Sequence, residues 1–141
     1  METPDWLEEI DHTGDIGIRV RAASLEQLFE RAAIGMFGII TDLEDVVPTE
    51  SREVVVEASD RDDLLVRWLS ELNYIHLVEG LLFCRFEIRR IDDRGLTAVA
   101  FGEPIDRDRH MIHTEVKAVT YHGLSIEASD GAWTAQVIFD M

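Results

Sequence analysis

Cysteine is almost missing from this 141-residue sequence, in which Cys84 is the only one. A single cysteine excludes an internal disulfide and a cysteine-rich zinc site, and a cytosolic location is the simplest interpretation. Long apolar runs are missing too, because no stretch approaches the roughly 20 residues of a membrane-spanning helix. The N-terminus is acidic and lacks the basic start of a signal peptide. We therefore expect a cytoplasmic protein that does not insert into a membrane.

Basic residues are scarce relative to acidic ones. The 29 Asp and Glu outnumber the 13 Lys and Arg, which gives a formal net charge of −16. Direct nucleic-acid binding needs a basic surface that displaces counterions from phosphates, so this balance argues against strong binding of that kind. The same charge suits solubility, binding of divalent cations, or docking to a basic partner protein.

The remaining composition is that of a folded domain, with 46% hydrophobic and 30% charged residues. Apolar residues at three-to-four spacing predict one helix over 25–40, with Ser24 as its N-cap. A second helix is predicted between the capping Asp60 and Gly80, which is typical of the residue after a helix end. The larger aromatic side chains expected in the core are Phe29, Phe37, Trp68 and Trp133.

Alternating apolar residues and turn signals predict many strands. They are expected near residues 6–10 and over 16–20, 52–58, 81–91, 96–101, 115–121, 124–128 and 133–139. His122 and Gly123 are expected to turn the chain between two of them, and Asp130-Gly131 predicts a tight hairpin turn. This pattern indicates an α+β fold, a single domain over residues 1–141 in which mostly antiparallel sheets are covered by two main helices.

Several polar residues are weak candidates for a site. His110 and His113 are three apart, but no helix or further ligand accompanies them, so we expect both on the face of a loop. The acidic stretch 42–45 lacks the spacing of an EF-hand and is expected to be a solvated loop. His76 is expected to pack at the edge of a helix stripe, and Cys84 to be an inert strand residue.

Acidic residues stand at the start of the first long strand and at the end of the last one. Asp15 follows the glycine-containing corner 11–14 and leads into the strand pattern. Asp140 closes the last strand, and Met141, as the final residue of the sequence, carries a terminal carboxylate. These three carboxyl groups converge if the two strand ends meet in space.

The sequence resembles the archease family from end to end. The matching stretches are HTGDIG at 12–17, ITDL at 40–43, LLVRWLSEL at 64–72, VKAVTYH at 116–122 and IFDM at 138–141. They cover both ends and the middle in the order of the family. The sequence departs from the family in two small ways. Gly14 stands where the family usually has Ala, and Met141 stands where a β-branched aliphatic residue is common.

The resemblance implies an accessory protein and not an enzyme. It implies activation of an RtcB-type RNA ligase in tRNA splicing, by promoting guanylylation of the ligase, supporting multiple turnover and broadening its nucleotide use. It also implies a divalent-metal site carried by Asp15, Asp140 and the Met141 carboxylate, with no catalytic residues. Three carboxylates are hard oxygen donors, which suit Ca²⁺ and, as alternatives, Mg²⁺ or Mn²⁺. His12 could orient Asp15 or only belong to the turn.

Two other functions stay open at the level of sequence. One is a chaperone-like binding partner of a tRNA-modifying enzyme such as a methyltransferase, which has also been suggested for archease-like proteins. The other is a metal-dependent hydrolase that uses Asp15, Asp140 and His12, although the sequence shows no nucleophile–base pair or phosphate-binding loop. The order of the strands and any role of the 42–45 loop are not predicted.

Overall fold

The fold is described by a computed structural model that covers residues 3–12 and 14–141, the side chain of His12 excepted. The helices are α1 (Leu25–Ile40) and α2 (Arg61–Glu79), with a short 3₁₀ turn, η1 (Leu43–Asp45). The strands are β1 (Leu7–His12), β2 (Asp15–Ala22), β3 (Glu50–Glu57), β4 (Leu81–Asp92), β5 (Gly95–Pro104), β6 (Ala118–Ser129) and β7 (Ala132–Asp140).

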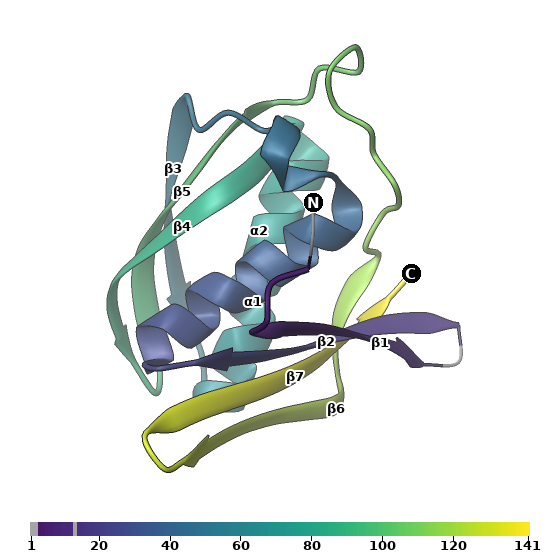
Figure 1. The fold of residues 1–141 in the computed structure, drawn as a ribbon. Coiled ribbons are helices and arrows are strands. Elements are labelled where there is room, and N and C mark those ends of the chain that lie inside the picture. The colour runs from purple at the N-terminus through teal and green to yellow at the C-terminus, as the bar shows by residue number, and fades with distance from the viewer. Residues whose placement is uncertain (1–2, 13) are drawn as a thin grey trace.

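The described strands form two antiparallel sheets (Figure 1). The four-stranded sheet has the order β1-β2-β7-β6, so that strands from both ends of the sequence lie side by side at its centre. The three-stranded sheet has the order β3-β5-β4. The prediction of an α+β fold with mostly antiparallel sheets and two main helices is confirmed. The strand order is new information, because it depends on pairing between distant residues.

Both helices begin, and α2 also ends, where local signals predict. The Ser24 hydroxyl accepts a hydrogen bond from the Gln27 N–H at 3.1 Å, and an Asp60 carboxylate oxygen accepts one from the Asp63 N–H at 2.8 Å. Such N-caps each stabilise a helix by about 1 kcal/mol. α2 ends at Gly80, whose φ of +67° lies in the left-handed region that glycine adopts without strain.

The helices lie between the two sheets, with α1 packed against β2 and β4, and α2 against β3, β4 and β6 (Figure 1). Phe29, Phe37 and Trp68 are fully buried as predicted. The prediction for Trp133 is wrong, because this residue is only half-buried and the Arg61 guanidinium lies 5.0 Å from its ring centre. Trp133 stands near the start of β7, at the rim of the sheet. No helix among the described residues is long and apolar enough to span a membrane.

The strand β6 differs from its prediction. Instead of two strands separated by a turn at His122-Gly123, residues 118–129 form one strand with an irregularity in its middle. Thr120 pairs with Ile138 and Ser125 pairs with Gln136, so residues 121–124 lie opposite Val137 alone. The extra residues form a bulge larger than the common type with two residues opposite one, and Gly123 permits its bend through a φ of +68°. The turn predicted at Asp130-Gly131 is present, with positive φ at both residues.

Candidate functional site

The strand ends that carry Asp15 and Asp140 are neighbours in the four-stranded sheet. β2 and β7 are antiparallel, and Ile16 pairs with Phe139 in their ladder. Asp15 and Asp140 occupy the next positions along the same two strands. Side chains opposite each other in an antiparallel pair share one face of the sheet. Because Ile18 and Val137 point into the core between the sheets, the alternation of the strands directs both carboxylates to the outer face.

The two acids differ in exposure, and neither has a cationic partner among the residues that the structure describes. Asp15 is half-buried and Asp140 is exposed, whereas Met141 is half-buried and packs against the core. Neither carboxylate forms a side-chain hydrogen bond or an ion pair with a described residue. The backbone of Asp140 is fixed more firmly, because its carbonyl accepts a hydrogen bond from the Lys117 N–H at 2.9 Å.

The donor chemistry at these strand ends fits a divalent cation. Among the described residues, no three His, Cys, Asp or Glu side chains lie together as a metal-binding group. The predicted set has a different composition, since it consists of two aspartates and the terminal carboxylate of Met141. All of its donors are carboxylate oxygens, the ligands that Ca²⁺, Mg²⁺ and Mn²⁺ prefer. The expected role of His12 concerns a side chain that lies outside the described residues.

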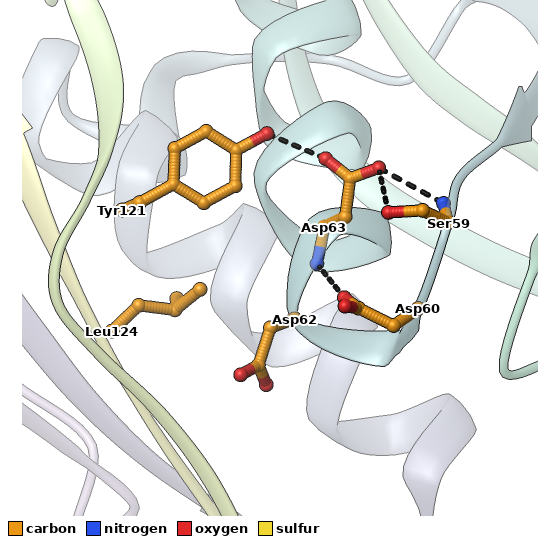
Figure 2. Close-up of a pocket in the computed structure, with 6 residues that line it drawn as sticks. All are labelled: Ser59, Asp60, Asp62, Asp63, Tyr121 and Leu124. Atoms are coloured by element: carbon orange, nitrogen blue, oxygen red, sulfur yellow. Dashed lines mark hydrogen bonds between the residues drawn. The ribbon is translucent and has the colours of Figure 1, made fainter.

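A second polar cluster surrounds Asp63 and was not anticipated from sequence. One Asp63 oxygen accepts the Tyr121 hydroxyl at 2.5 Å, and the other accepts the Ser59 N–H at 3.0 Å and its hydroxyl at 3.1 Å (Figure 2). Arg67 donates to the same carboxylate at 2.9 Å. These residues border a shallow cavity of about 420 Å³ lined by Ser59, Asp60, Asp62, Asp63, Tyr121 and Leu124.

The hydrogen bonds to Asp63 explain its electrostatics. The Tyr121 hydroxyl and the Ser59 N–H hold the pKa of the Asp63 carboxyl well below its usual value, and the same carboxylate raises the pKa of Tyr121. An ionised, fully bonded carboxylate is poorly suited to proton transfer. The cluster instead joins the first turn of α2 to the bulge of β6. Only the Asp63–Arg67 pair, four residues apart, could have been recognised in the sequence.

The prediction that His110 lies on a loop face is wrong. His110 is buried, and its Nδ1 accepts a hydrogen bond from the Asp106 N–H at 2.9 Å. Its Nε2 therefore carries the proton, and it lies 3.0 Å from both the Asp45 carbonyl and a Glu103 carboxylate oxygen. Arg109 forms an ion pair with Glu103 at 2.5 Å and lowers the pKa of Glu103 to about 2.

This cluster joins two connecting segments to the end of β5. Besides the contacts of His110, a Glu103 oxygen accepts the Val47 N–H at 2.7 Å. The segment after α1 and the segment after β5 are thereby held together by one buried carboxylate. Sequence reasoning missed it because Glu103 lies at the end of a strand of ordinary alternation and its partners lie in two different loops.

The other candidates are structural. His113 Nε2 lies 3.0 Å from an Asp42 carboxylate oxygen, which joins the 42–45 segment to the loop before β6 and makes it more than a solvated loop. His76 is buried, with Nδ1 2.8 Å from the Leu81 carbonyl, so its predicted packing role is confirmed. Cys84 is half-buried in β4, and burial raises the pKa of its thiol, which agrees with an inert residue.

Comparison with known proteins gives one consistent result. The family model described as Archease protein family (MTH1598/TM1083) matches residues 7–141. Proteins named archease from Methanopyrus kandleri and Pyrococcus abyssi are each 44% identical to this chain. Both alignments cover 95% of this chain, and they cover 98% and 97% of the respective relatives.

Solved structures agree with the sequence comparison. The solution structure of Methanobacterium thermoautotrophicum protein 1598 is 37% identical and superimposes with a TM-score of 0.81, covering 96% of this chain and 99% of that one. The crystal structure of an archease from Thermotoga maritima, described there as a possible chaperone, is 25% identical with a TM-score of 0.58. That alignment covers 100% of this chain and 98% of the Thermotoga chain.

Proposed function

The chain belongs to the archease family, and on this basis we propose that it is a metal-binding accessory protein of an RtcB-type RNA ligase. In this role it promotes guanylylation of the ligase in the cytoplasm, supports repeated turnover during tRNA splicing and broadens the nucleotides that the ligase accepts. The observation that carries the proposal is the neighbouring position of Asp15 and Asp140 at the ends of paired strands in a chain of this family.

Asp15, Asp140 and the carboxylate of Met141 are the residues that would hold the cation. A bound Ca²⁺, Mg²⁺ or Mn²⁺ would supply positive charge at an acidic edge of the molecule. Without such a charge, neighbouring carboxylates repel each other and raise one another's pKa. The outward direction of the Asp15 and Asp140 side chains leaves the site accessible to a partner protein.

The charge of the chain supports docking to a protein that binds nucleic acid. A net charge of −16 complements the basic surface with which such an enzyme holds RNA phosphates. Attraction between surfaces of opposite charge raises the association rate more than it raises the final affinity. The role of the acidic surface is therefore to bring the accessory protein to the ligase quickly.

A chaperone-like role towards a tRNA-modifying enzyme such as a methyltransferase is the second candidate. It is favoured by the description of the Thermotoga maritima archease as a possible chaperone. The two roles differ in what co-purifies with the chain. An RtcB-type ligase as the main partner supports activation of ligation, whereas a methyltransferase without any ligase supports the chaperone-like role.

Multiple-turnover ligation of tRNA halves by a purified RtcB-type ligase tests the proposal. The chain should raise the number of turnovers, and Asp15→Ala and Asp140→Ala should remove most of this effect. Asp108→Ala is the matched control, because Asp108 is an exposed acid outside the candidate site. Full activation by the Asp15→Ala and Asp140→Ala variants would show that activation of the ligase does not depend on these carboxylates.

A further inference from the structure

The peptide group between Val116 and Lys117 is hydrogen-bonded on both sides. Its carbonyl accepts a hydrogen bond from Asn73 Nδ2 at 2.8 Å, and its N–H donates to the Asp140 carbonyl at 2.9 Å. Asn73 belongs to α2 and Asp140 ends β7, so a single peptide connects the helix to the end of the last strand. A carbonyl that accepts a hydrogen bond polarises its peptide and strengthens the N–H as a donor.

Asn73 is a polar residue on the buried, mainly apolar face of α2. It is 5% exposed and follows the fully buried Leu72. Its amide orientation is fixed by its partner, because only the NH₂ group can donate to the Val116 carbonyl. Among the described residues, Asn73 Oδ1 is the only buried side-chain oxygen or nitrogen without a hydrogen-bond partner. An unpaired buried acceptor is costly, which indicates that the hydrogen bond made by Nδ2 serves a specific purpose.

A second contact from α2 holds the chain a few residues further on, within β6. The Tyr121 hydroxyl donates to Asp63, in the first turn of the helix (Figure 2). The residues between the two contacts pair with the end of β7, since Ala118 lies opposite Asp140 and Thr120 opposite Ile138. α2 therefore holds this short segment at both ends, and the segment in turn holds Asp140.

We propose that Asn73 is a positioning residue for the Asp140 half of the cation site. Through the Val116–Lys117 peptide it fixes the backbone of Asp140, and with it the direction in which the carboxylate points. The inference rests on the proposed cation site and names a residue that acts on that site from the core. Groups that orient metal ligands commonly change metal affinity when they are replaced.

The test compares cation binding in two variants of the same helix. Asn73→Leu keeps nearly the same size and removes the donor. Trp68→Phe is the matched control, because it removes another buried side-chain donor of α2, the indole N–H that binds the Phe29 carbonyl at 2.9 Å. Calorimetric titration with Ca²⁺ and with Mn²⁺ gives the affinity of each protein, and hydrogen exchange of the Lys117 amide in metal-free protein reports the local contact.

Asn73→Leu should bind the cation about fivefold more weakly, the effect of losing about one ordinary hydrogen bond, and its Lys117 amide should exchange faster. Trp68→Phe should lower the melting temperature and leave the cation affinity within about twofold of the parent, as expected for a distant change. If Asn73→Leu does not fold, Asn73→Ala removes the same donor without adding a branched side chain and should give the same result.

Three results are distinguishable. Equal cation affinity in the parent and the Asn73 variant would overturn the positioning role while leaving the cation site in place. A similar loss in Trp68→Phe would overturn it as well, because the effect would then follow general stability. A parent protein that binds neither cation would refute the proposed site itself, and this result is obtained from the parent alone.

Discussion

Replacing Glu103 with Gln is expected to destabilise the protein only at pH values where Glu103 is ionised in the native state. The Glu103 carboxylate is 8% exposed, pairs with Arg109 and His110 and accepts the Val47 N–H. These contacts lower its pKa from 4.5 to about 2. A glutamine of the same size retains one acceptor but loses the charge, so the ion pair with Arg109 is removed with little change in packing.

The magnitude follows from the pKa. A fall from 4.5 to about 2 corresponds to about 3 kcal/mol of native-state stabilisation. The Arg109 side chain is 47% exposed, so solvent screening reduces this to about 2 kcal/mol. Because the pKa of the folded state is depressed, the stabilisation is fully present above pH 4.5 and is lost as the pH falls towards about 2.

Urea unfolding of the parent and Glu103→Gln between pH 7 and pH 3 measures this difference. The variant should be less stable by about 2 kcal/mol at pH 7, and the gap should shrink steadily below pH 4.5. Glu53→Gln serves as the control, since Glu53 is exposed on β3, and it should change stability by less than about 0.5 kcal/mol at any pH. A gap for Glu103→Gln that stays constant across this range would refute the ion-pair explanation.

Three further predictions concern other parts of the molecule. Tyr121→Phe should lower the free energy of unfolding, measured by urea titration, by about 1–2 kcal/mol, because Asp63 loses a hydroxyl donor. Unchanged stability would show that the Tyr121–Asp63 hydrogen bond does not stabilise the contact between α2 and β6. Met141→Val should keep ligase activation while a C-terminal extension abolishes it, since the proposed site uses Met141 only through its terminal carboxylate; full activation by the extended protein in ligation assays would exclude this ligand. The association rate with the ligase should fall as salt rises, because exposed charges are screened over about 8 Å at physiological ionic strength; a rate independent of salt in stopped-flow mixing would argue against electrostatic docking.

Local signals were sufficient for the helices. Ser24 and Asp60 act as caps through residues three positions later, and Gly80 ends α2 through its own backbone. The bulge of β6 could not be predicted, because it depends on pairing between strands and not on a local signal. Gly123 has the positive φ of a turn residue, and only the pairing of β6 with β7 shows that the chain continues in the same direction.

The site could be anticipated only in part. The acids at the ends of two strand patterns were visible in the sequence, but the pairing of Ile16 with Phe139 that brings those ends together joins residues at opposite ends of the chain. Glu103 and Asp63 were missed because neither carries a periodic signal. Their hydrogen-bond partners include Arg109 and Tyr121, which lie in a loop and in a bulge that sequence patterns do not specify.

The central claim is that Asp15 and Asp140 allow this archease to promote guanylylation of an RtcB-type ligase. The most direct measurement is the rate at which labelled GMP is transferred from GTP to the ligase in the presence of Mn²⁺, with parent protein, Asp15→Ala, Asp140→Ala or Asp108→Ala added in equal amounts. We predict that the parent and Asp108→Ala accelerate labelling, whereas the other two variants leave it near the rate of the ligase alone. Acceleration by all four proteins, or by none of them, would contradict the account.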